Sequence, residues 1–202
     1  MTDLSEYHIK MIEAVAKAAQ PILRRYYKED CCIIATRVVI EVLKKLHFKN
    51  VKPFVIEANI FNEVYVRKGR TPANEEEAQE WLKEGAWQIV LGDRVDNVKG
   101  KWPGHLVVLI NDQYMLDVAI YQACRPNKNI YLEPLFTKVF EDFVKGEDRC
   151  QLMYSNCLII YQAFPNDKSY QNVKDWQDLS RSKMAVNEIY SEVRTLLKKK
   201  TK

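Results

Sequence analysis

The stretch from His105 to Ile120, HLVVLINDQYMLDVAI, decides the fold that this sequence predicts. Two apolar runs flank the polar residues Asn111-Asp112-Gln113, so we expect an antiparallel hairpin. Side chains alternate along a strand, and a turn with an odd number of residues keeps His105 and Asp117 on one face. A two-residue turn would separate them. With three turn residues, Asp117 lies diagonally across the ladder from His105, within reach of a side-chain contact.

Helices are predicted before this hairpin and at the end of the chain. The first spans Leu4 to about Tyr27, and Pro21 is expected to break or kink it. The second starts with Asp30 as its N-cap and runs to about Leu46; its apolar residues lie on all sides, which predicts burial. A C-terminal helix is expected from about Val173 to Lys200.

Further strands and one small helix complete the expected domain. The strands are Val51 to Phe61, Ala86 to Leu91 and one long or two short strands within Cys150 to Phe164, and the small helix is Thr71 to Gly85. Helices first, an antiparallel sheet in the middle and a closing helix predict one α+β domain over residues 1–202, with the buried N-terminal helix packed on the sheet. Residues 63–104 form a long insertion that we expect to act as a lid.

Composition and charge narrow the classes of function. The 202 residues include 31 basic and 27 acidic side chains, and Lys198, Lys199, Lys200 and Lys202 account for the whole excess. We therefore expect a solvated helix end, with nucleic acid an unfavoured partner. No apolar run approaches the roughly 18 residues needed to span a bilayer, and the acidic N-terminus does not resemble a secretory signal. These features predict a cytoplasmic protein without membrane contact.

No motif predicts a metal ion or an organic cofactor. The five cysteines contain no Cys-x-x-Cys pair, and His8, His47 and His105 are scattered, so the spacing of a four-ligand zinc site is missing. Neither a P-loop nor a Gly-x-Gly-x-x-Gly fingerprint occurs. The sequence therefore predicts chemistry by side chains alone.

The predicted helices and strands carry the residue types that catalysis by a cysteine thiolate requires. Nucleophilic catalysis requires a thiolate, a base that forms it and a group that orients the base. If Asp30 caps the second helix, Cys31 and Cys32 occupy its first two positions, where free amides lower the pKa of a thiol and can receive an oxyanion. His105 and Asp117 would supply the base and the acid. The same residues have ordinary roles: a small buried thiol, a histidine bonded to a carbonyl and an aspartate that caps an amide.

Several short motifs follow one another between Cys32 and Pro126. They are Cys32-Ile-Ile-Ala-Thr-Arg, Glu41-Val-Leu, the strand end at Asn62, Gly104-His105-Leu-Val-Val, Leu116-Asp117, Gln122 and Arg125-Pro126. This pattern resembles a bacterial and phage group in the transglutaminase-like branch of the papain-like cysteine superfamily. The resemblance implies that fold, with Cys32 as nucleophile, His105 as general base and Asp117 as the residue that orients the imidazole. Cys31, rotated by about 100° on the helix, would face elsewhere.

The expected function is thiol-dependent acyl transfer from an amide bond of a peptide or protein, as in cysteine peptidases, deamidases and transglutaminases. His105 would deprotonate Cys32, the thiolate would attack the carbonyl, and water or an amine would resolve the thioester. Asn62, Trp102 and Gln122 are expected to bind the substrate. Two alternatives stay open: a non-catalytic interaction protein on the same scaffold, and a nucleic-acid-associated protein that uses the Lys-rich C-terminal tail.

Overall fold

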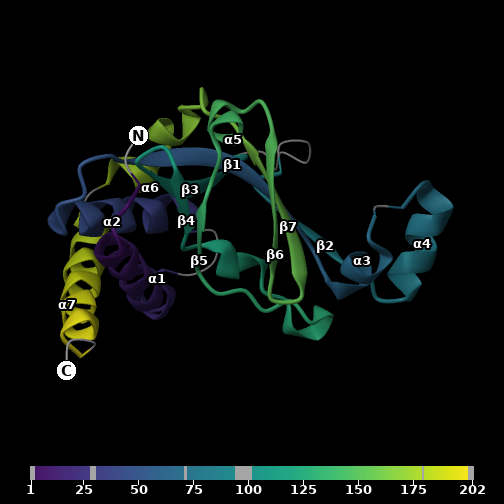
Figure 1. Cartoon of the computed structure of the whole chain (residues 1–202), viewed down its shortest axis with the longest axis horizontal. Helices are drawn as coiled ribbons and strands as arrows, with labels where there is room; N and C mark the ends of the chain where they lie inside the picture. Colours follow the sequence, from purple (N-terminus) through teal and green to yellow (C-terminus); the bar gives the residue numbers. More distant parts are fainter. Residues whose placement is uncertain (1–2, 28–30, 71, 94–101, 179, 200–202) are drawn as a thin grey trace.

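The computed structural model describes residues 3–27, 31–70, 72–93, 102–178 and 180–199. Within them the chain is α+β: a seven-stranded antiparallel sheet curls beside helices from both ends of the chain (Figure 1). The sequence expectations for Asp30, Thr71, residues 94–101 of the lid, Leu179 and residues 200–202 lie outside the described residues.

Helices form both ends of the described chain and several short connections. The α-helices are α1 (Glu6–Tyr26), α2 (Cys32–Lys45), α3 (Glu63–Lys68), α4 (Glu75–Lys83), α5 (Glu141–Lys145), α6 (Lys174–Gln177) and α7 (Lys183–Lys199). The 3-10 helices are η1 (Ile120–Ala123), η2 (Pro126–Lys128), η3 (Ser169–Asn172) and η4 (Ser180–Ser182). Helix α1 continues through Pro21, so the expected break is wrong. Pro21 is exposed while Ile22 and Leu23 after it are buried, and the packing of that face outweighs one lost backbone hydrogen bond.

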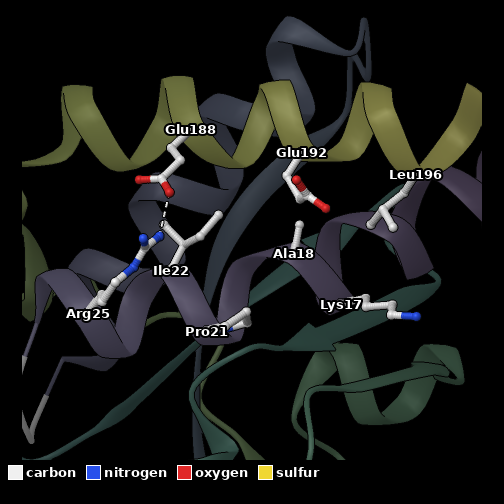
Figure 2. Close-up of a pocket in the computed structure, with 8 residues that line it drawn as sticks. All are labelled: Lys17, Ala18, Pro21, Ile22, Arg25, Glu188, Glu192 and Leu196. Carbon is white, nitrogen blue, oxygen red and sulfur yellow. Dashed lines mark hydrogen bonds and ion pairs between the residues drawn. The ribbon is translucent and has the colours of Figure 1, made fainter.

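The expected C-terminal helix is divided into two. Helix α6 ends at Gln177 because Asp178 has an extended backbone, and the Asp178 side chain accepts hydrogen bonds from the Ser180 amide at 2.9 Å and the Ser180 hydroxyl at 2.6 Å. Such local side-chain bonds compete with helical ones. Helix α7 then lies beside α1, where Arg25 and Glu188 form an ion pair (Figure 2).

Strand β1 is the centre of the sheet. The strands are β1 (Val51–Phe61), β2 (Gln88–Leu91), β3 (His105–Ile110), β4 (Tyr114–Asp117), β5 (Leu135–Lys138), β6 (Arg149–Tyr154) and β7 (Cys157–Ala163). Their order is β5-β4-β3-β1-β7-β6, with β2 also paired to β1. Strands β3 and β2 follow each other along the same side of β1, since Ile56 pairs with His105 and Ala58 with Leu91. The start of β3 therefore lies at the middle of β1.

Each face of the sheet packs against a separate hydrophobic core. Helices α1, α2 and α7 pack on one face, against residues such as Val55, Leu106 and Leu116. Residues of alternate register, such as Val107 and Met115, lie in the second core with β6, β7 and α5. Helices α3 and α4 lie at one end of the molecule, and α1, α2 and α7 lie at the other (Figure 1). None of the described helices is long and apolar enough to cross a bilayer.

Candidate active site

Helix α2 presents two neighbouring cysteines at its N-terminus. Cys31 is the N-cap residue and Cys32 the first helical residue, so the helix starts one position later than expected. The Thr36 hydroxyl donates to the Leu106 carbonyl oxygen at 2.6 Å, which anchors α2 against β3. This anchor places Cys32 beside the start of β3, where its Sγ lies 4.0 Å from the Gly104 carbonyl oxygen.

His105 and Asp117 meet as the three-residue turn predicts. Ile110 pairs with Tyr114 across the turn, and His105 Nε2 lies 3.0 Å from each carboxylate oxygen of Asp117. His105 is 1% exposed and Asp117 is fully buried. Because Nε2 faces the carboxylate, Nδ1 is the ring nitrogen left to exchange a proton with Cys32, whose thiol helps to raise the pKa of the imidazole.

The pKa of His105 is raised above its ordinary value of 6.5. Burial alone lowers it, but the charge of Asp117 and the hydrogen bond to Asp117 together outweigh burial, and the Cys32 thiol adds to them. An imidazole of this kind holds a proton at neutral pH. The pair can therefore store the proton that a nucleophilic thiol gives up.

Asp117 is held by more than the imidazole. The Ala119 amide donates to Oδ1 at 3.1 Å, and the Tyr161 hydroxyl donates to Oδ2 at 3.3 Å. The bond to Ala119 turns the chain out of the ladder, so β4 ends at Asp117 and the strand expected to reach Ile120 does not. Helix η1 follows and brings its residues to the start of α2.

Gln122 on η1 caps the start of α2. Its side-chain oxygen accepts hydrogen bonds from the backbone N–H groups of Cys31 at 2.7 Å and Cys32 at 3.3 Å. The Cys31 Sγ lies 3.0 Å from the Tyr121 hydroxyl. Burial raises the pKa of the Cys31 thiol, so the expectation that the helix start lowers it is wrong for this cysteine. Cys31 is a buried thiol with polar neighbours on η1.

Trp102 lies directly against the peptide that delivers His105. A Cβ atom on Gly104 would come within 2.5 Å of the Trp102 ring, so the glycine makes room for the indole. The Trp102 Nε1 donates to the Ser169 hydroxyl at 2.8 Å, and the ring meets Tyr170 edge-on with centroids 6.4 Å apart. Trp102 is half-buried beside the site, held there by η3.

Asn62 does not join the other predicted site residues. Its amide donates to the Gly85 carbonyl oxygen at 2.9 Å and accepts from the Trp87 N–H at 3.1 Å, so it closes the excursion that carries α3 and α4. It follows the end of β1, six residues beyond Ile56, or about 20 Å along an extended strand. Asn62 therefore lies away from Cys32 and His105, which corrects its expected role in binding the substrate. Of the expected lid, Gly92 and Trp102 lie against the start of β3, and its action as a lid stays a prediction.

Two residues that the sequence analysis did not select contribute to the site. Gly92 has φ +79°, and a Cβ atom there would lie 2.4 Å from the backbone nitrogen of His105. Tyr161 lies in a strand whose alternate residues are buried, and its hydroxyl reaches Asp117. A tyrosine at a buried position of an alternating strand was the available signal for Tyr161. The close approach at Gly92 depends on how β2 and β3 align along β1, which no local pattern gives.

No group of three or more histidine, cysteine, aspartate or glutamate side chains within the described part of the chain could hold a metal ion. The site is built from Cys32, His105 and Asp117 with hydrogen-bonding neighbours. Comparison of the chain with protein-family models, with curated proteins and with solved structures found no match.

Proposed function

We propose that this protein is a thiol-dependent acyl-transfer enzyme that acts on amide bonds, with a papain-like or transglutaminase-like fold. The observation that supports this most strongly is the buried His105–Asp117 pair beside a cysteine that starts a helix. A carboxylate and an imidazole are costly to bury unless they are paired, and buried pairs of this kind cluster at functional sites. Cys32 is the nucleophile in this proposal, His105 the base and Asp117 the group that orients it.

The proposed reaction moves one proton and one acyl group. His105 accepts the Cys32 proton, and the sulfur attacks the amide carbonyl of a peptide or protein. The oxyanion accepts hydrogen bonds at the start of α2, where the Gln122 oxygen now lies, so that oxygen must withdraw. The C–N bond breaks as the imidazolium gives its proton to the leaving amine. Water or a second amine then attacks the thioester, with His105 again taking the proton, and Cys32 is restored.

One observation favours the non-catalytic alternative on the same scaffold. Cys32 is 9% exposed and His105 1% exposed, so the site is closed in this conformation. A substrate could reach the sulfur only after side chains around it move. Nothing among the described residues adds to the nucleic-acid alternative; Lys198 is exposed on α7, as expected for a solvated helix end.

Acylation by an activated ester tests the proposal. The protein is incubated with p-nitrophenyl acetate at neutral pH, and the intact mass and the modified peptide are determined. We expect one acetyl group on Cys32, release of acetate on longer incubation, and no acetylation of Cys32→Ser. Cys150→Ser, which removes a buried thiol from β6, is the control and should be acetylated like the wild type. Acetylation spread over several cysteines, or none on Cys32, would contradict the enzymatic function.

A further inference from the structure

We propose that Tyr161 is a positioning residue of this site: its hydroxyl holds the Asp117 carboxylate in line with His105. The inference rests on the proposed function, because it concerns how the base is oriented. It assigns a task to a side chain of β7, far along the sequence from the other residues of the site.

The hydrogen bond from Tyr161 joins two strands of the curled sheet that are not neighbours, β7 and β4. Strands β1 and β3 separate β7 from β4 in the sheet order, yet the Tyr161 hydroxyl lies 3.3 Å from Asp117 Oδ2. Tyr161 is fully buried and belongs to the core on that face, opposite Ala58 of β1. A long-range bond to a buried carboxylate fixes both partners.

The Asp117 carboxylate depends on this donor. Its Oδ1 accepts from the Ala119 amide as well as from His105, whereas the other partner of Oδ2 is the Tyr161 hydroxyl. Without that hydroxyl, Oδ2 would keep only the imidazole. A hydrogen bond to the charged form of an acid favours that form.

The tyrosine remains a donor over the whole working range of pH. Burial, the charge of Asp117 and the hydrogen bond to Asp117 raise the pKa of Tyr161 well above its ordinary value. From β6, Cys150 and Tyr154 face Tyr161, and burial raises the pKa of each, so both are neutral in mildly acidic buffer.

The effect of Tyr161 is therefore seen at the hydrogen bond between His105 and Asp117. A carboxylate that loses the Tyr161 hydroxyl is held by the Ala119 amide and the imidazole alone, so it turns more easily about its Cβ–Cγ bond. That turning weakens the bond that orients the imidazole.

Tyr161→Phe tests this by two measurements at pH 6: the NMR signal of the His105 Nε2 proton and the rate of Cys32 alkylation with iodoacetamide. We expect the Nε2 proton to exchange with water faster, which broadens its signal, and alkylation to slow about tenfold, as the loss of one hydrogen bond to a charge implies. Tyr114→Phe is the matched control: Tyr114 is also buried and donates to a carboxylate at 3.3 Å, but to that of Asp3. Both quantities should equal those of the wild type.

A second variant keeps both the packing and the hydrogen bond. With 3-fluorotyrosine at position 161 the phenol is a stronger donor, and both quantities should stay at the wild-type level. Slower alkylation of Tyr161→Phe with an unchanged Nε2 proton signal would mean that Tyr161 is only structural, and would overturn the inference. If alkylation of wild-type Cys32 is unaffected by His105→Ala, the proposed function fails and the inference fails with it. If wild-type alkylation depends on His105 and Tyr161→Phe changes neither quantity, the inference alone is overturned.

Discussion

The Nε2 atom of His105 lies 3.0 Å from both oxygens of the Asp117 carboxylate, and both side chains are buried. A carboxylate and an imidazole are costly to bury unless each has a hydrogen-bonding partner, and here each is the partner of the other. Its members come from the two strands of one short hairpin, so the pair is built by local structure. Cys32 comes to it from a separate helix, through the contact of α2 with β3.

The pair makes stability depend on pH. The folded protein holds the His105 proton above pH 6.5, where the unfolded chain loses it, because the pKa of His105 is raised. This contribution is complete below that pH and is lost as the pH rises through the folded pKa. In Cys32→Ser, where no thiol supplies that proton, the free energy of unfolding should fall from pH 7 to 8.5, by up to about 1.4 kcal/mol per pH unit for one proton.

Asp117→Asn, added to Cys32→Ser, should remove most of this slope. Neither the carboxylate nor the thiol then raises the pKa of His105, and burial lowers it, so folded and unfolded chains hold nearly the same number of protons on it over this range. Urea unfolding at several pH values measures both slopes. Equal slopes with and without Asp117→Asn would show that Asp117 does not hold the proton on His105.

Gly92→Ala should displace the base. The new Cβ atom would lie 2.4 Å from the His105 nitrogen and 2.7 Å from the Gly104 carbonyl carbon, and backbone atoms cannot rotate away. We expect a loss of about 2–3 kcal/mol in stability and at least about tenfold slower alkylation of Cys32. Gly69→Ala is the control, because Gly69 also has positive φ, +67°, but nothing lies within 4 Å of its Cβ position.

The control should lose only about 1 kcal/mol and keep the wild-type alkylation rate. Urea unfolding and iodoacetamide kinetics give the two quantities. If Gly92→Ala and Gly69→Ala behaved alike, the close approach of Gly92 to His105 would have no bearing on the site.

Gln122→Ala should favour acylation of Cys32 over alkylation. The Gln122 oxygen accepts from the N–H groups of Cys31 and Cys32, which a developing oxyanion would need. Acetylation by p-nitrophenyl acetate passes through an oxyanion and alkylation by iodoacetamide does not, so the ratio of the two rates isolates this step. We expect the ratio to rise several-fold, with about 1 kcal/mol of stability lost because the helix cap is removed. A lower ratio would mean that Gln122 assists the oxyanion.

Local patterns in the sequence predicted the hairpin and its consequences. The odd turn at Asn111-Asp112-Gln113 was sufficient to place His105 and Asp117 on one face, and the register confirms it. The apolar run after Cys32 predicted a buried helix, which α2 is. The resemblance to the papain-like superfamily stays a prediction.

Features that depend on distant pairing could not be read from the sequence. Asn62 ends a strand, but β1 extends well past the point where β3 starts, and only the sheet register shows that the site lies beside the middle of β1. Tyr161 meets Asp117 because β7 lies in the same curled sheet. The end of β4 and the break after α6 depend on aspartate side chains that bond their own backbone, at Asp117 and Asp178.

Alkylation at pH 6 followed by peptide mapping tests the central claim, that Cys32 is a nucleophile activated by His105. An ordinary thiol is almost wholly protonated at this pH and reacts slowly, whereas a thiol whose proton has passed to an imidazole reacts readily. We expect iodoacetamide to mark Cys32 first, His105→Ala to slow the reaction, and Cys31→Ser to leave it nearly unchanged. Labelling of Cys31 in place of Cys32 would move the nucleophile by one residue. A folded wild-type protein in which Cys32 does not react, or reacts equally fast without His105, would contradict the account.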